Sequence, residues 1–153
     1  PWRLPDRRAA IHDAAPGPDE EGDHLPDLVP LMPVARNRWE RCNQILAWSK
    51  TEFPVPPETR IVVVPKVMYL KHECAGLTGR GGRNGGMVIT LSSSLLPNKT
   101  CAVIVLLHEI SHTILYDEGL GILHGARFHG VHGELCDRYE HHGELDSLAF
   151  STE

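Results

Sequence analysis

The sequence lacks a long hydrophobic run, a closely spaced pair of cysteines and an excess of positive charge. Its longest apolar run, Cys101 to Leu107, is far shorter than the ~20 residues of a membrane-spanning helix. The four cysteines form no C-x-x-C pair, which excludes zinc ribbons and thioredoxin-like motifs. Twenty acidic against fifteen basic residues give a net charge of −5, the wrong sign for a general nucleic-acid binder.

No charged segment followed by an apolar core opens the sequence, so we expect no secretory signal peptide. We therefore expect reduced thiols, mostly buried as small apolar side chains. The expected location is the cytoplasm of a cell or host cell, or a viral particle. A length of 153 residues, with 41% hydrophobic and 23% charged residues, is ordinary for one globular domain.

The first 35 residues differ in composition from the rest of the chain. Seven of the twelve prolines lie there, together with an acidic run at 19–23. Prolines at this density prevent a long helix, so residues 1–35 are expected to form an extended arm. Such an arm can dock on a partner protein and hold the domain in an assembly. Residues 36–153 are expected to form the folded domain.

β-Branched runs and glycines predict a small sheet. Residues 60–66 and 87–92 are typical of strands, and a further strand is expected near 73–78. The glycine-dense stretch 76–86 is interpreted as a mobile hairpin loop. It does not fit a phosphate-binding loop, since it lacks a GKS or GKT ending and a strand rather than a helix follows it.

Three helices are predicted around this sheet. Residues 36–53 place apolar side chains at helical spacing. A helix that is apolar on almost all sides begins at Asn98 or Lys99 and ends before Gly119, and such a helix is expected to be buried. A last helix covers 127–139. The predicted fold class is α+β, with a small mixed sheet of about three strands.

Histidine is the residue in excess, and seven of the ten histidines lie between His108 and His142. His108 and His112 belong to an H-E-x-x-H motif in the predicted buried helix. Residues four apart on a helix share one face, about 5–6 Å between their Cβ atoms, so both imidazoles reach one zinc ion. Glu109 is rotated about 100° around the helix and stands beside the open coordination position. It can take a proton from the zinc-bound water.

A catalytic zinc ion requires a third protein ligand and an open fourth position. The longer pattern H-E-x-x-H-x-x-G-x-x-H is broken, because Leu115 and Glu118 stand where Gly and His are needed. Several residues further along the chain remain as third ligands. They are two acids, two histidines of the last helix and the histidine after the Gly119-Leu120-Gly121 turn: Glu134, Glu144, His129, His132 and His124.

The motif HEISH, followed by HGARFHGVHGELCDRYEHHGELDSLAF, resembles the SprT-like zinc metallopeptidases. In that family H-E-x-x-H is followed by a short loop and by HGxxF or HGxxW at the start of the next helix. The resemblance covers about residues 36–150. It implies a minimal zincin fold, His108, His112 and His124 as Zn²⁺ ligands, and Glu109 as the general base. The chain has neither the zinc ribbon nor the basic DNA-binding region often found in the family's DNA-repair proteases.

Two functions are therefore expected from the sequence. The first is a zinc-dependent metallopeptidase that hydrolyses a protein or peptide substrate by a Zn-activated water. In such proteases a substrate pairs with the edge strand above the zinc, and we expect that edge in or next to residues 87–91. The alternative is a zinc-stabilised structural or interaction protein, with protease activity lost or incidental. Arg80 and Arg83 of the glycine-dense stretch are candidates for a contact with substrate or a partner, and Tyr116 is a candidate for a hydrogen bond near the site.

Overall fold

The computed structural model describes residues 34–81 and 84–141, and the prediction of an α+β fold is confirmed in this part of the chain. Its helices and strands follow one another in the order α2 (Arg38–Glu52), β1 (Arg60–Val64), β2 (Val67–Tyr69), β3 (His72–Cys74), β4 (Gly76–Gly81), β5 (Gly86–Ser92), α3 (Lys99–Leu115), the 3₁₀ helix η2 (Tyr116–Glu118) and α4 (Ala126–Glu140).

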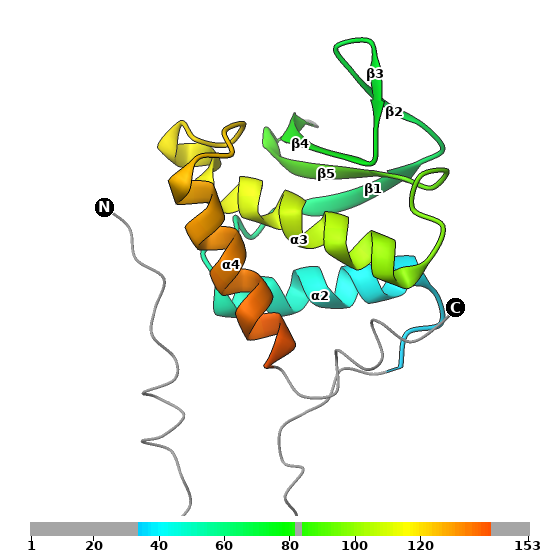
Figure 1. Ribbon diagram of the computed structural model, residues 1–153, viewed down its shortest axis with the longest axis horizontal. Coiled ribbons are helices and arrows are strands. Elements are labelled where there is room, and N and C mark those ends of the chain that lie inside the picture. The colour runs from blue at the N-terminus through cyan, green and yellow to red at the C-terminus, as the bar shows by residue number, and fades with distance from the viewer. Residues whose placement is uncertain (1–33, 82–83, 142–153) are drawn as a thin grey trace, which may run out of the picture.

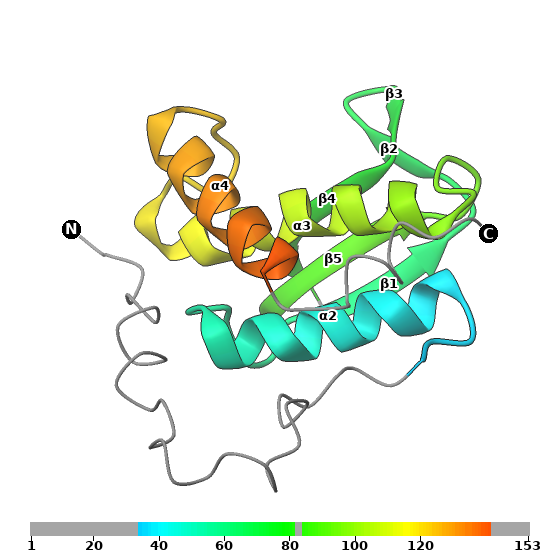
Figure 2. The same cartoon turned by 60° about the horizontal axis from the view of Figure 1, so that its bottom comes forward.

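The three-stranded sheet has the order β1-β5-β4. β5 lies in the centre, parallel to β1 and antiparallel to β4, so the sheet is mixed. β1 and β4 are thus the two edge strands next to residues 87–91, and β4 is the one that packs against α3. β2 and β3 form a separate antiparallel hairpin, which stands out from the sheet (Figures 1 and 2).

Helix α3 lies at the centre of the fold. It packs against α2 and α4 and against the sheet strands β4 and β5, and Figure 2 shows α2 running beneath it while α4 crosses one end. Fully buried side chains from each layer meet there, among them Ile45, Ile89, Leu106 and Leu135. The expectation that α3 is buried almost all round is wrong at Ile104, whose side chain is 54% exposed. The helix is therefore open to solvent at this position.

Local sequence signals explain where α3 begins and ends. The side chain of Asn98 accepts a hydrogen bond from the backbone N–H of Cys101 at 2.9 Å, as an N-cap residue does. At the other end η2 tightens the last turn, and Gly119 adopts a φ of 74°. This left-handed conformation favours glycine and reverses the chain toward α4.

Most of the glycine-dense stretch is strand and not a loop, which corrects the prediction. Gly76–Gly81 forms β4, and residues 82–83 lie outside the described residues. Gly76 permits close packing, because a Cβ atom there would lie 2.8 Å from Cγ1 of Val105 on α3. The strand expected near 73–78 is accordingly divided between β3 and β4. The short strand β2 was not predicted.

Some predictions fall on residues that the structure does not describe. The arm lies outside them except for its last two residues, and so do His142 and Glu144. All four cysteines are free, which agrees with reduced thiols, but only Cys42 is buried and the other three are half-buried. None of the helices in the described ranges is long and apolar enough to cross a membrane.

Candidate metal centre

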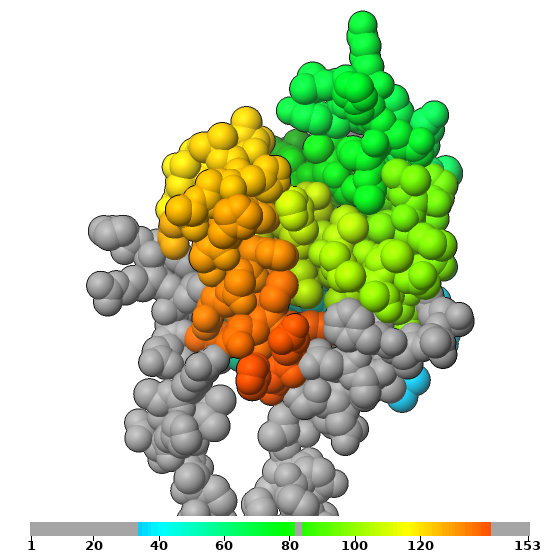
Figure 3. Space-filling view, viewed as in Figure 1, coloured from blue at the N-terminus to red at the C-terminus, as the bar shows by residue number. Residues whose placement is uncertain are grey.

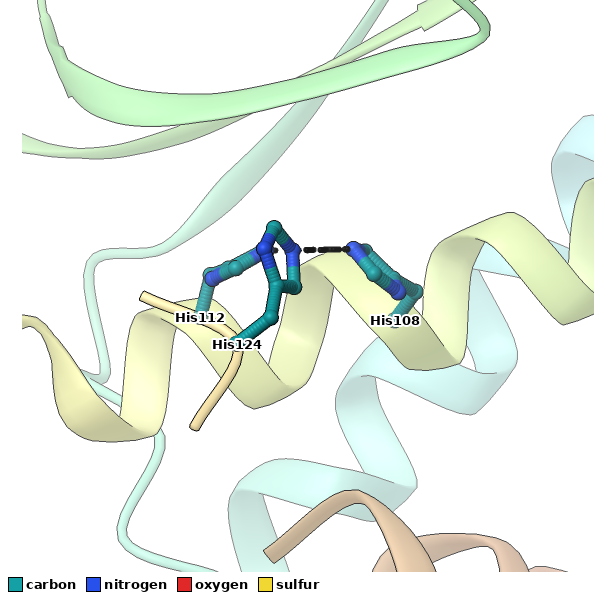
Figure 4. A group of neighbouring side chains, drawn as sticks. All are labelled: His108, His112 and His124. Atoms are coloured by element: carbon teal, nitrogen blue, oxygen red, sulfur yellow. Dashed lines mark hydrogen bonds between the residues drawn. The ribbon is translucent and has the colours of Figure 1, made fainter. Parts of the chain in front are cut away.

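Three histidine side chains converge on one point beside α3 (Figure 4). His108 and His112 lie one helical turn apart, and His124 comes from the loop that precedes α4. The Nε2 atom of His108 lies 3.1 Å from Nε2 of His112 and 3.1 Å from Nε2 of His124. Two nitrogens bound to a tetrahedral zinc ion at ~2.0–2.1 Å would be ~3.3 Å apart. The three histidines can therefore hold a metal ion.

The other described residues named as third ligands, His129, His132 and Glu134, do not join this group. Glu134 receives a hydrogen bond from Arg138 at 2.7 Å on the same helix. The ring of His132 stacks on Phe128 and lies 5.9 Å from the ring of His108, measured between centroids. Among the described residues, the group that can hold a metal consists of His108, His112 and His124 alone.

A packed turn brings His124 to the helix. A Cβ atom on Gly121 would lie 2.4 Å from Cδ2 of Tyr116, so only glycine lets these two segments approach so closely. The guanidinium of Arg80 on β4 lies 5.4 Å from the centre of the Tyr116 ring and pairs with Asp117. Arg80 and Tyr116 thus anchor the turn to the sheet. Arg83 lies outside the described residues.

The environment favours the neutral form of the His108 and His112 rings, the form that metal binding requires. Burial lowers the pKa of His112 to about 4, and repulsion from His108 and His124 acts in the same direction. Burial also lowers the pKa of His108, followed by repulsion from His124 and His132. Nδ1 of His112 is buried and forms no hydrogen bond of good geometry. The backbone of Gly121 acts to raise the pKa of His112, against the larger effect of burial. A carbonyl in this position orients a metal-binding imidazole.

The lowered histidine pKa values predict that acid destabilises the metal-free protein. In the unfolded chain His112 takes up a proton near its ordinary value of 6.5, whereas the folded chain resists protonation until about pH 4. The free energy of unfolding therefore falls as the pH decreases through this interval. Thermal unfolding of chelator-treated protein at pH 7 and pH 5 measures the effect.

Matched variants separate this effect from other titrating groups. His112→Asn is expected to reduce the fall in melting temperature between pH 7 and pH 5. His141→Asn changes an exposed histidine at the end of α4 and is expected to preserve it. An equal pH dependence in wild type and His112→Asn would contradict the explanation.

Glu109 is held between α3 and the edge strand. Its side chain is buried, with 6% of the residue exposed. The hydroxyl of Thr78 on β4 donates a hydrogen bond to Oε2 of Glu109 at 2.5 Å. Burial raises the pKa of Glu109, while this hydrogen bond opposes the shift. The sequence did not single out Thr78, because no spacing pattern connects two residues that are 31 positions apart.

A cavity of about 250 Å³ opens over the histidines and Glu109. The first half of β4 forms one wall, and Tyr69, Cys74 and Ile122 extend the lining toward the hairpin and the turn. The carboxylate of Glu109 is the one acidic or basic group among its lining residues apart from the histidines. The cavity thus joins a metal-binding group, a carboxylate and the edge of a sheet.

Comparison with known protein families, curated proteins and solved structures finds no match for this chain.

Proposed function

We propose that the chain is a zinc-dependent metallopeptidase of the SprT-like kind. The observation that supports it most is the convergence of three imidazole nitrogens, with the Glu109 carboxylate adjacent in the same cavity. Three protein ligands leave a fourth position for a reactant, which distinguishes catalytic from structural zinc sites. A set of three neutral imidazoles suits Zn²⁺ better than Mg²⁺ or Ca²⁺, which prefer oxygen ligands.

The bound zinc would lower the pKa of a water molecule and polarise the substrate carbonyl. Glu109 accepts the proton from the attacking water, whose oxygen forms the new bond to the carbonyl carbon. Glu109 then donates this proton to the amide nitrogen as the C–N bond breaks. The raised pKa of Glu109 suits both steps, because the group must accept a proton and release it again.

The proposal is tested with the full chain loaded with one equivalent of Zn²⁺. We expect metal analysis to give one zinc per chain and an unfolded protein such as casein to be cleaved. A chelator should stop cleavage, and added Zn²⁺ should restore it. A zinc-loaded chain that cleaves neither casein nor short peptides would contradict the proposed activity.

Thr78 is expected to position Glu109 for proton transfer. Thr78→Val keeps the shape of the side chain but removes the hydroxyl that donates to Glu109. The expected result is a fall in kcat of about tenfold to 100-fold, with unchanged zinc content and little change in KM. The measurement is steady-state hydrolysis of one peptide together with metal analysis.

The variant Thr78→Ser serves as the control for this prediction. It restores the hydroxyl in a smaller side chain and is expected to recover most of kcat. If Thr78→Val and Thr78→Ser lose activity equally, Thr78 acts through packing and not through its hydroxyl.

The free cysteines support a reducing compartment, and we propose the cytoplasm as the location. The role of residues 1–35 in an assembly stays a prediction. Size-exclusion chromatography before and after their deletion tests it, and an unchanged oligomeric state would count against that role.

A further inference from the structure

Exposed apolar side chains gather on two sides of the cavity. The β2–β3 hairpin presents Met68, Tyr69 and Leu70, which we call the hairpin rim. The turn before His124 presents Ile122 and Leu123, which we call the loop rim. These two rims contain five of the nine exposed large hydrophobic residues in the described ranges. Figure 3 shows the hairpin and the turn as separate elevations on the surface above α3.

Both rims reach the same cavity as the histidines. Tyr69 from the hairpin rim and Ile122 from the loop rim line it together with Leu77 of β4. A molecule that contacts the metal-binding group therefore lies between two apolar walls. Leu70 and Ile122 are 74% and 70% exposed, so burial against a bound molecule would remove much apolar surface from water.

The turn of the hairpin rim has a backbone conformation that is unfavourable for the two residues in it. Tyr69 pairs with His72, and the two residues between them, Leu70 and Lys71, have φ angles of 48° and 68°. Two-residue turns with two positive φ angles favour Asn and Gly. A leucine here is both strained and exposed, and such features often mark functional positions.

Charge in and around the cavity also favours an uncharged ligand. Apart from the histidines, Glu109 is the one charged group that lines it. The nearby Arg80 and Asp117 form an ion pair with each other. Apart from the proposed zinc ion and the proposed general base, a lysine or aspartate side chain entering the cavity would meet no opposite charge among the lining residues, and its desolvation would be costly.

The shape fits an extended peptide. At about 250 Å³ the cavity is smaller than the ~300–1,000 Å³ that encloses a whole small molecule, so only part of the ligand enters. Along the described residues β4 pairs with β5 on one side and with no strand on the other. An unpaired strand offers backbone hydrogen bonds to a second strand laid beside it.

We propose that the site selects extended peptide segments with large apolar side chains next to the bond that is cleaved. The hairpin rim and the loop rim take these side chains, one on each side of the histidines. This substrate class rests on the proposed peptidase function, but peptide binding can be measured without hydrolysis.

The experiment uses three ten-residue peptides of Gly, Ser and Thr that differ at two adjacent central positions. These positions are Leu-Leu, Lys-Lys or Asp-Asp. Hydrolysis by the zinc-loaded wild type gives kcat/KM, and calorimetry with zinc-loaded Glu109→Gln gives affinity without cleavage. We expect the Leu-Leu peptide to be preferred by about tenfold to 100-fold in both measurements.

Surface variants identify the two rims as the source of this preference. Tyr69→Ser and Ile122→Ser are each expected to reduce the preference about tenfold. Leu95→Ser changes an apolar residue that is 43% exposed and does not line the cavity, so it should leave the preference unchanged. Thermal unfolding of each variant establishes that the fold is retained.

The outcomes separate this inference from the proposed function. Preferred binding of the Leu-Leu peptide without any hydrolysis by the wild type would support the apolar site and count against the peptidase. Hydrolysis of all three peptides without preference for Leu-Leu would contradict the proposed substrate class but not the proposed peptidase activity. A preference that survives in both rim variants would also contradict the proposed substrate class.

Discussion

Glu109→Gln is expected to lower peptide hydrolysis by about 10²–10⁴-fold while the chain keeps its zinc. The amide has nearly the shape of the carboxylate, so it preserves packing against Gly76 and the contact with Thr78. It cannot accept the proton of the attacking water. The measurement combines kcat on a short peptide with metal analysis of the same sample.

Glu134→Gln is the matched control. Glu134 was an alternative third ligand, and in the structure it pairs with Arg138 on α4, away from the histidine group. This variant should keep both zinc and activity. Full hydrolysis by Glu109→Gln would exclude Glu109 as the general base.

His124→Asn is expected to weaken zinc binding by at least about 100-fold. Substitution of a residue that only supports a zinc ligand already costs about tenfold to 100-fold in affinity, and this substitution removes one of three nitrogens. Since His124 is exposed in a loop, the metal-free fold should survive. Competition with a chromophoric chelator measures the affinity, and thermal unfolding of the metal-free protein checks the fold.

His129→Asn provides the comparison for His124→Asn. It changes an exposed histidine of α4 that lies outside the metal-binding group. Zinc affinity should stay at the wild-type value. Wild-type affinity in His124→Asn would mean that the third ligand is another residue, and the proposal of a SprT-like peptidase would lose its main support.

The helices and the metal-binding pair were predictable because their signals are local. His108 and His112 sit four residues apart, and Asn98 caps the helix three residues before the N–H that it binds. Choosing His124 over His129, His132 or the acids needed the family resemblance, since the residues alone left all of them open. The structure brings His124 to the pair by means of the turn at Gly119 and Gly121.

The parts that escaped prediction depend on contacts between distant segments. The glycines of β4 give this segment the composition of a loop. At Gly76, however, a residue without a side chain is needed because α3 lies against the strand. Thr78 contacts Glu109 across the strand–helix interface, and Tyr69 and Ile122 come from distant segments that line the same cavity. Periodicity within one segment contains no information about such pairs. Strand β2 was too short to show an alternating pattern.

Two glycines without any chemistry of their own determine the geometry of this site. Gly76 lets the edge strand approach Glu109, and Gly121 lets the turn close on Tyr116. In a screen of random substitutions for peptidase activity, alanine at either glycine should reduce activity as much as substitution of a metal ligand or of Glu109. Measuring zinc content as well would distinguish the two variants. Substitution of Gly121 should release the metal, whereas substitution of Gly76 should give an inactive protein that still binds zinc.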